Sequence, residues 1–255
     1  MLKIFVGFDD RQIISFTTLV ASIYDTASKP VAVSPLVLET LPITRRGLTP
    51  FTFSRFLVPW LCDFQGAAIF MDADMLFVSD VCELEESISD EYAVSVVKSL
   101  EKFEQTSFML INCEHPAHRR LTPEFVQDSQ IDFHGLEWVD ESEIGDLDPK
   151  WNQLVGYQDI DPTQGNLHYT MGIPAFAETS TSAGADSWRS IAKRAMSAEP
   201  WAEIMGPSVH VVNVEGVKFP KYVWDFEQQR PKPEHLELVN TLVLKRREQL
   251  KAAGS

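Results

Sequence analysis

Two aspartates, Asp72 and Asp74, interrupt an apolar stretch of the sequence. Residues 67–78 read AAIFMDADMLFV, so an apolar run typical of a buried strand leads directly into the pair and resumes after it. Two carboxylates inside a hydrophobic block cost free energy unless a counter-charge neutralises them. Placed two residues apart at a strand end, they can converge on one cation, and Mg²⁺ or Mn²⁺ shares such oxygens with substrate phosphates. The pattern indicates a divalent metal site that holds a diphosphate, and the alternative interpretation is a solvated turn.

A second stretch, residues 168–174 (HYTMGIP), could complete such a site. His168 ends a β-like segment, and a neutral imidazole is a common metal ligand. Gly172 would permit a close approach between the backbone and a ligand. Taken alone, His168 is better interpreted as a structural histidine, so its candidacy depends on the aspartate pair.

Arg55 and Asn152 are further candidates for chemistry. Arg55 stands among the apolar positions of a helix predicted over residues 52–61. Its side chain could extend to the surface, or it could reach over the sheet edge to a phosphate or carboxylate. Asn152 and Gln153 form a polar pair after Trp151 that could touch a sugar or its acceptor.

The elements that would position these residues begin at the N-terminus. Residues 2–8 form a predicted buried strand, 12–27 an amphipathic helix and 31–38 a second strand. This β-loop-α-β opening is typical of a nucleotide-binding α/β sheet. Ligands in such sheets bind beyond the carboxyl ends of the strands, where both the loop 9–11 and the aspartate pair fall.

Weaker signals mark the later elements. The segment 80–87 is predicted as a short acidic helix, 98–105 as a mobile polar loop and 108–111 as a strand. Thr122 followed by proline and glutamate is a helix-start signal. Residues 233–252 are predicted as a C-terminal helix.

Composition excludes some classes of function. The 255 residues carry a formal net charge of −15, so bulk charge does not attract nucleic acid or an anionic membrane. No apolar run approaches the roughly 20 residues of a membrane-spanning helix. The three cysteines, Cys62, Cys82 and Cys113, lack metal-ligand spacing and are interpreted as buried thiols in a reducing compartment. We therefore expect a cytoplasmic protein without a membrane span.

In their order along the chain, these motifs resemble a family of retaining glycosyltransferases with the type A fold. The resemblance is to the family 8-like group that includes glycogenin and lipopolysaccharide galactosyltransferases, in a bacterial and phage branch. The matching blocks are the strand ending at Phe8–Arg11, Ser54-Arg55, Asp72-Ala73-Asp74, residues 107–113 (SFMLINC), Glu137-Trp138, Ile144-Gly145, Trp151-Asn152 and residues 168–174.

The resemblance implies a fold and a set of roles. The fold would be a single Rossmann-like α/β domain with a mixed central sheet and a small C-terminal helical extension. Asp72, Asp74 and His168 would bind Mn²⁺ or Mg²⁺, which would bridge the diphosphate of a nucleotide sugar, usually UDP-linked. The implied donor-binding residues are Phe8, Asp9, Asp10, Arg11, Arg55, Met71, Asp72, Ala73, Asp74 and Gly172. The implied catalytic residues are Asp72, Asp74, Arg55 and Asn152.

Residues 1–177 would then form the catalytic domain, and 178–255 a C-terminal segment of helices and one strand packed on it, a candidate for acceptor binding. The leading hypothesis is a retaining, hexosyltransferase-like enzyme. A metal-dependent phosphohydrolase with Asp72 as nucleophile is the first alternative, although such enzymes place the motif after the N-terminal strand. The second alternative is a non-catalytic protein that binds nucleotide sugars or glycans.

The acceptor is the least determined part. A glycan or small molecule is favoured over nucleic acid, because the overall charge is strongly negative. A hydroxylated base in phage DNA stays open as an acceptor. Acceptor choice is expected to lie in loops such as residues 98–105 and in the C-terminal segment. By the family layout, Arg45-Arg46 would border the donor pocket, so any anionic acceptor is expected to bind near this pair.

Overall fold

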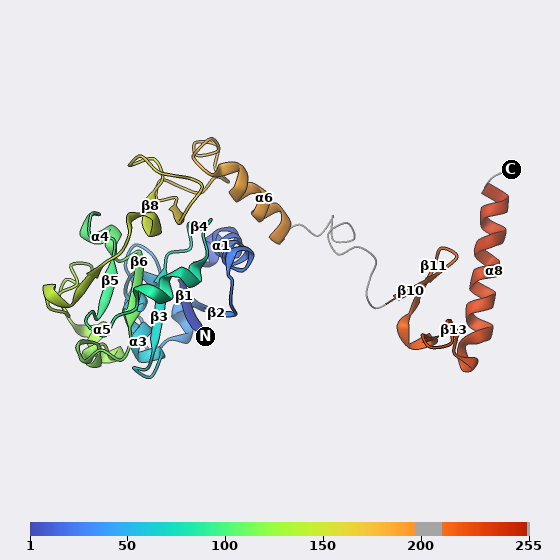
Figure 1. Cartoon of the computed structure of the whole chain (residues 1–255), viewed down its shortest axis with the longest axis horizontal. Coiled ribbons are helices and arrows are strands. Elements are labelled where there is room, and N and C mark those ends of the chain that lie inside the picture. Colours follow the sequence, from blue (N-terminus) through green and yellow to red (C-terminus); the bar gives the residue numbers. More distant parts are fainter. Residues whose placement is uncertain (197–210, 254–255) are drawn as a thin grey trace. The chain divides into compact units, whose positions relative to one another are not determined.

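The computed structural model describes residues 1–196 and 211–253, and Figure 1 shows their elements. The contacts between residues divide the chain into two units, Met1–Met196 and Ser197–Ser255. Each unit is described by itself. The functional division after residue 177 stays a prediction.

A mixed six-stranded sheet forms the centre of the first unit, with the order β2-β1-β3-β6-β5-β7. The first three strands in this order run parallel, β6 is antiparallel to both of its neighbours, and β7 pairs parallel with β5. This arrangement confirms the predicted fold class. The strands are β1 (Leu2–Gly7), β2 (Val31–Leu36), β3 (Ala67–Met71), β5 (Val94–Val96), β6 (Phe108–Asn112) and β7 (Ile144–Asp146).

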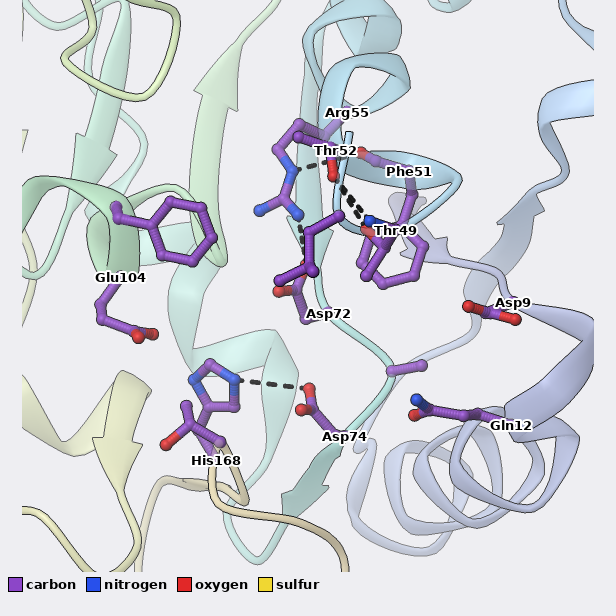
Figure 2. A pocket seen from close by; sticks show the side chains of 14 residues that line it. Asp9, Gln12, Thr49, Phe51, Thr52, Arg55, Asp72, Asp74, Glu104 and His168 are labelled. Carbon is purple, nitrogen blue, oxygen red and sulfur yellow. Dashed lines mark hydrogen bonds and ion pairs between the residues drawn. The ribbon is translucent and has the colours of Figure 1, made fainter. Parts of the chain in front are cut away.

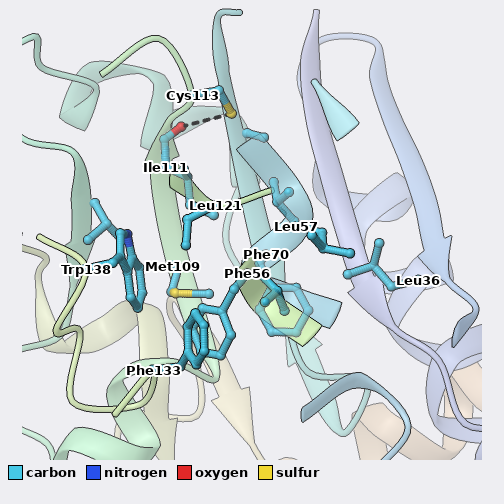
Figure 3. Close-up of a cluster of buried hydrophobic side chains, with 14 of the residues drawn as sticks. Leu36, Phe56, Leu57, Phe70, Met109, Ile111, Cys113, Leu121, Phe133 and Trp138 are labelled. Atoms are coloured by element: carbon cyan, nitrogen blue, oxygen red, sulfur yellow. Dashed lines mark hydrogen bonds between the residues drawn. The ribbon is translucent and has the colours of Figure 1, made fainter. Parts of the chain in front are cut away.

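Strand β3 is buried on both faces, which explains its continuous apolar sequence. Successive side chains of a strand point to opposite faces. Ala68 and Phe70 therefore enter one hydrophobic cluster, and Ile69 and Met71 enter the other. The first cluster contains Phe56, Phe133 and Trp138 around Met109 of β6 (Figure 3), and the rings of Phe56 and Phe133 stack at 5.1 Å. The second contains Leu19 and Ile23 of α1 (Ile13–Thr26).

A second, three-stranded sheet continues directly from the aspartate pair. It has the order β4-β9-β8, with β4 (Met75–Phe77), β8 (Gln153–Leu154) and β9 (Asn166–His168). Leu76 and Leu167 of this sheet pack with Trp188 of α6 (Ala185–Met196). The aspartates thus lie where the chain passes from one sheet to the other.

Several short elements differ in detail from their predictions. The predicted helix 52–61 is α2 (Phe51–Ser54), a 3-10 turn over Arg55–Leu57 and α3 (Val58–Leu61). The segment 98–105 was predicted as a loop, but it ends in α4 (Lys102–Gln105). The buried Gln105 side chain fixes it by donating to Lys98 O at 3.2 Å and Leu100 O at 2.7 Å.

Other local predictions hold. The Thr122 hydroxyl accepts a hydrogen bond from Phe125 N at 3.3 Å and begins α5 (Pro123–Asp128), as its sequence indicated. The acidic segment forms a 3-10 helix over Val81–Ser87. All three cysteines are buried free thiols.

The described residues of the second unit, 211–253, contain two antiparallel strand pairs and a long helix. Glu215 and Gly216 both have positive φ, which suits the two-residue turn of its first hairpin. Phe219, Val223, Val239 and Val243 form its core. The elements are β10 (Val211–Val214), β11 (Val217–Pro220), β12 (Trp224–Asp225), β13 (Arg230–Pro231) and the predicted C-terminal helix, α8 (Leu236–Ala253).

Among the described residues, no helix is both long enough and apolar enough to cross a lipid bilayer.

Candidate functional site

The site lies beyond the carboxyl end of β3, where Asp72-Ala73-Asp74 connects the two sheets. Asp72 N donates a hydrogen bond to Ser107 O at 2.9 Å, just before β6. Asp74 O accepts one from Tyr169 N at 2.9 Å, just after β9. The main chain is therefore anchored on both sides, and the two carboxylates have a fixed starting point.

Strand pairing brings His168 to the same place. Met75 of β4 lies opposite His168 of β9, so the histidine lies beside Asp74. His168 Nε2 is 3.4 Å from Asp74 Oδ1. Asp72, Asp74 and His168 can each offer one ligand atom, and these atoms lie within 4.8 Å of one another. The structure thus assembles the three residues that the sequence indicated, although almost a hundred positions separate His168 from the pair.

Asn152 holds the other nitrogen of His168. Its amide nitrogen donates to Glu104 O and to Ser107 Oγ, both at 3.0 Å, so its Oδ1 faces His168 Nδ1 at 2.9 Å. Because Oδ1 can only accept, Nδ1 must carry the hydrogen. In the neutral imidazole, the lone pair of Nε2 is then on the side of Asp74, which is how a metal-binding histidine is usually oriented. Asn152 is fully buried and acts on this site through His168.

Arg55 is buried beside Asp72 and does not extend to the surface. It is 3% exposed, and its Nη2 lies 3.1 Å from Asp72 Oδ1. Its Nη1 donates to Thr106 O at 2.8 Å, and its guanidinium lies 4.8 Å from the centre of the Phe70 ring. The second interpretation of this residue, a reach over the sheet edge to a carboxylate, is the one that the structure shows.

The electrostatics fit a divalent cation. Burial raises the pKa of Asp72 to about 6, even though Arg55 opposes this shift. Within the described residues, the buried Asp72 Oδ1 accepts no hydrogen bond of good geometry. Burial also lowers the pKa of His168, but Asp74 and Asp72 outweigh it and raise that pKa above its ordinary value. The single positive charge of Arg55 does not neutralise the two carboxylates, Asp72 and Asp74. Two carboxylates and an imidazole are suitable ligands for Mn²⁺ or Mg²⁺, which would supply the missing positive charge.

Arg55, Asp72, Asp74 and His168 line an open pocket with a cavity volume of about 170 Å³ (Figure 2). Asp9 and Gln12 lie at one end of it in this view, Glu104 lies at the other, and Asp72 and Asp74 lie between them. The lining residues are Asp9, Gln12, Leu48, Thr49, Phe51, Thr52, Arg55, Asp72, Ala73, Asp74, Phe103, Glu104, His168 and Thr170.

The predicted donor-binding residues divide into two groups. Asp9, Arg55, Asp72, Ala73 and Asp74 line the pocket. The other five do not line it. The ring of Phe8 packs on Phe16 at 5.4 Å between ring centres, and Met71 is buried in the core. Asp10 and Arg11 are exposed, and Gly172 has a φ of +117°.

Asp9 lines one end of the pocket, and its carboxylate forms an ion pair with Arg11. Arg11 donates from Nε to Asp9 Oδ1 at 2.9 Å and from Nη2 to Oδ2 at 2.5 Å. The hydrogen bonds from Arg11 lower the pKa of Asp9 below its ordinary value. Asp9 also accepts from Arg11 N and so begins the 3-10 turn that leads into α1.

Four lining residues are not among the individually predicted site residues, although two of them lie in the loop 98–105 that was expected to take part in acceptor choice. Thr49 and Thr52 come from the turn before and within α2, and Phe103 and Glu104 come from α4. Their residue types and spacing are unremarkable, and no pattern in the sequence distinguishes them from other surface positions. Their contribution comes from the packing of α2 and α4 around the carboxyl end of the sheet.

The fold defines a class of protein. No protein-family model matches the chain. Its structure is similar to the bifunctional glycosyltransferase WbbM, with a TM-score of 0.59 and 16% identity over 80% of this chain and 51% of that one. It is also similar to the galactosyltransferase LgtC in complex with donor and acceptor sugar analogues, with a TM-score of 0.54 and 12% identity over 79% of this chain and 99% of that one. The glycosyltransferase GlyE of Streptococcus pneumoniae gives a TM-score of 0.54 and 14% identity over 86% of this chain and 66% of that one. The chain thus has the type A fold of glycosyltransferases, and it spans about half the length of WbbM.

The sequence identifies the family within this class. Protein CDI of Arabidopsis thaliana is 35% identical over 219 residues, which cover 73% of this chain and 84% of the relative. The chain belongs to the family of Protein CDI. The narrower resemblance to family 8 and to a bacterial and phage branch stays a prediction.

Proposed function

We propose that this protein is a metal-dependent glycosyltransferase. It would move a sugar from a nucleotide-diphosphate donor, a UDP-sugar, to a hydroxyl group of an acceptor with retention of configuration. The observation that carries this proposal is the convergence of Asp72, Asp74 and His168 within 4.8 Å, at the ligand-binding edge of a type A glycosyltransferase fold. The three buried free thiols support a reducing compartment, and a cytoplasmic location is part of the proposal.

Each residue of the site would have a separate role in such a reaction. Asp72, Asp74 and His168 would hold Mn²⁺ or Mg²⁺, which supplies Lewis-acid stabilisation of the negative charge on the departing diphosphate. Asn152 keeps the His168 lone pair directed into the site. Arg55 orients Asp72 and adds positive charge beside it.

The bond changes are those of a glycosyl transfer. The bond between the anomeric carbon and the diphosphate oxygen breaks, and its electron pair leaves with the nucleoside diphosphate. The acceptor oxygen forms the new bond to the anomeric carbon, and its proton passes to the departing phosphate oxygen. Asp9 and Gln12 lie at the end of the pocket nearest β1 and α1, and we assign the nucleoside of the donor to this end.

The alternatives have weaker support. A phosphohydrolase would need Asp72 as an accessible nucleophile, but its side chain is 18% exposed and faces Arg55. A non-catalytic binding protein would not need three metal ligands beside a buried guanidinium. Arg45 and Arg46 are outside the pocket lining, which gives no support to a DNA acceptor.

The test uses the full chain and a panel of nucleotide sugars, with and without Mn²⁺. We expect a UDP-sugar to raise the melting temperature only when Mn²⁺ is present, and we expect slow Mn²⁺-dependent release of UDP by transfer to water. NMR of the released or transferred sugar reports whether the anomeric configuration is retained. Hydrolysis of p-nitrophenyl phosphate without any donor turnover would replace this proposal with the phosphohydrolase, and donor binding without turnover would replace it with the binding protein.

A further inference from the structure

Helix α4 carries two side chains at the far end of the pocket that no step above uses. We propose that Phe103 and Glu104 form the acceptor subsite, and that the acceptor is an uncharged or cationic sugar-like compound and not an anion. This inference rests on the proposed function, because it assigns the second substrate of the same pocket.

Phe103 presents an aromatic surface to the pocket. It lines the pocket and is 53% exposed, so part of its ring is open to a molecule that enters there. Its ring packs against His134 at 4.9 Å, and the Thr106 hydroxyl holds His134 Nδ1 at 2.6 Å. Burial lowers the pKa of His134 to about 4, so the ring behind Phe103 is neutral. Phe103 is thus supported on one side and open on the other, as a platform for an apolar sugar face would be.

Glu104 places a carboxylate next to this platform. Its side chain lines the pocket at the end opposite Asp9, and in Figure 2 its carboxylate lies on the same side as His168. Within residues 1–196 and 211–253, no side chain or backbone group forms a hydrogen bond or ion pair with this carboxylate, although its charge helps to raise the pKa of His168. Its backbone is fixed, because Glu104 O accepts from Asn152 Nδ2 at 3.0 Å and from Ser107 Oγ at 2.6 Å. A positioned carboxylate without a partner can accept hydrogen bonds from hydroxyl or ammonium groups.

The charges of the pocket select against an anion. Its lining has four carboxylates, Asp9, Asp72, Asp74 and Glu104. Arg11 pairs with Asp9 and Arg55 with Asp72, and His168 Nε2 lies 3.4 Å from Asp74 Oδ1. As a metal ligand His168 would be neutral, so a divalent cation would balance the charges of Asp74 and Glu104, and the diphosphate of the donor would then leave a surplus of negative charge. An anionic acceptor at the Glu104 end would meet like charge on both sides.

The cations that could have gripped an anion are engaged elsewhere. Arg45 donates from Nη1 to Val126 O at 2.9 Å and to Ser129 O at 2.7 Å, and its guanidinium lies 3.8 Å from the centre of the Phe53 ring. Arg46 pairs with Glu39 at 2.6 Å. Neither lines the pocket, so the pair does not offer the expected grip for an anionic acceptor.

The experiment compares three acceptor probes that differ in charge but little in size. They are methyl glucoside, the methyl glycoside of glucosamine and the methyl glycoside of glucuronic acid. The readout is nucleotide release above the rate of donor hydrolysis, with Mn²⁺ and the donor identified by the panel above. We expect the amine to be used at least as well as the neutral glucoside, and the glucuronide to be used least.

Substitutions at Glu104 test whether this carboxylate sets the order. Glu104→Gln should lower the ratio of kcat/KM for the amine to that for the glucoside by about tenfold. It should raise the ratio of kcat/KM for the glucuronide to that for the glucoside by a similar factor. Glu101→Gln makes the same charge change at the residue before α4, outside the pocket lining, and should leave the order unchanged. Phe103→Ala should raise KM for all three probes, whereas Phe226→Ala, which removes a similarly exposed ring in the second unit, should not.

The outcomes separate this inference from the proposed function. If donor hydrolysis persists but the glucuronide is preferred, or if Glu104→Gln changes no ratio, the subsite assignment is wrong while the glycosyltransferase stands. If none of the probes stimulates nucleotide release while hydrolysis continues, the assignment is also wrong. If no donor turns over, the proposed function fails, and saturation-transfer NMR of the probes with wild type and Glu104→Gln still tests the subsite. Loss of probe contact only in the variant supports it, and equal contact contradicts it.

Discussion

Two buried histidines lie at opposite edges of the main sheet, and their surroundings differ. His168 lies beyond the carboxyl end of β3, with Nδ1 held by Asn152 and Nε2 directed at Asp74. His118 lies at the amino end of β5, where its Nε2 donates a hydrogen bond to Ala93 O at 2.8 Å. Carboxylates raise the pKa of His168, whereas burial lowers the pKa of His118 to about 4. Burial therefore does not distinguish a candidate ligand from a structural histidine, but the charge that faces the second nitrogen does.

The largest expected effect is at the carboxylates that face His168. Asp74→Asn keeps the shape of the side chain but removes a charge from the metal site, so turnover should fall by at least about 10²-fold while the fold survives. Mn²⁺-dependent donor hydrolysis measures the loss, and circular dichroism checks the fold. The control is Asp90→Asn, which removes an exposed carboxylate outside the pocket lining. Wild-type turnover in Asp74→Asn, or full activity of the native protein in EDTA, would contradict the metal assignment.

A smaller effect is expected from the residue behind His168. Asn152→Ala removes the acceptor that fixes Nδ1, so the lone pair of Nε2 is no longer held toward the site. Mn²⁺ affinity should fall by about 10- to 100-fold, as for other residues that orient metal ligands. Titration of Mn²⁺ by electron paramagnetic resonance measures it, with the exposed Asn240→Ala in α8 as the control. Unchanged affinity with lowered thermal stability would show that Asn152 only supports the core.

His118 should affect stability and not activity. Its pKa is lowered in the folded protein, so below about pH 6.5 the unfolded chain binds a proton that the native protein does not. Stability from this residue is present above that pH and is lost as the pH falls toward 4, by about 2 kcal/mol at pH 5. Urea unfolding at pH 7 and pH 5 should show this loss in the wild type and a reduced loss in His118→Gln. An equal loss in both would assign the pH dependence to other groups.

Arg45 should have the smallest effect on stability and, like His118, little effect on activity. Arg45→Ala removes two hydrogen bonds and a ring contact, so the free energy of unfolding should fall by about 1 kcal/mol. Donor turnover and its dependence on salt should stay within about twofold of the wild type, because salt screens only the charges that a substrate meets. A steep salt dependence that this substitution abolishes would restore the anionic acceptor.

The sequence predicted the edge of the sheet that holds Asp72 and His168 better than the rest of the pocket. An apolar strand that ends in two aspartates is a strong local signal, and the opening β-loop-α-β unit places it at the ligand-binding edge. Asn152 was recognised as a candidate, but its contact with His168 depends on strand pairing that local sequence does not encode. The loop 98–105 was predicted to take part in acceptor choice, but Glu104 within it could not be singled out, because a glutamate in a short polar segment looks the same on any surface.

The second unit was less predictable for a related reason. Its strands have between two and four residues each, too few for alternation of apolar and polar side chains to be recognised. The prediction for this part was helices and one strand, and the described residues contain two strand pairs before α8. The one predicted strand, over residues 209–214, matches β10 in its described residues, and the long helix was the other element recognised.

The most direct test of the central claim is Mn²⁺ binding by the native protein and by Asp74→Asn, with and without UDP. If Asp72, Asp74 and His168 hold the cation that a nucleotide diphosphate shares, the wild type binds one Mn²⁺ per chain, and binds it more tightly when UDP is present. The variant should then lose both the binding and its enhancement by UDP. Equal Mn²⁺ binding by the two proteins, or binding that UDP leaves unchanged, would contradict the account.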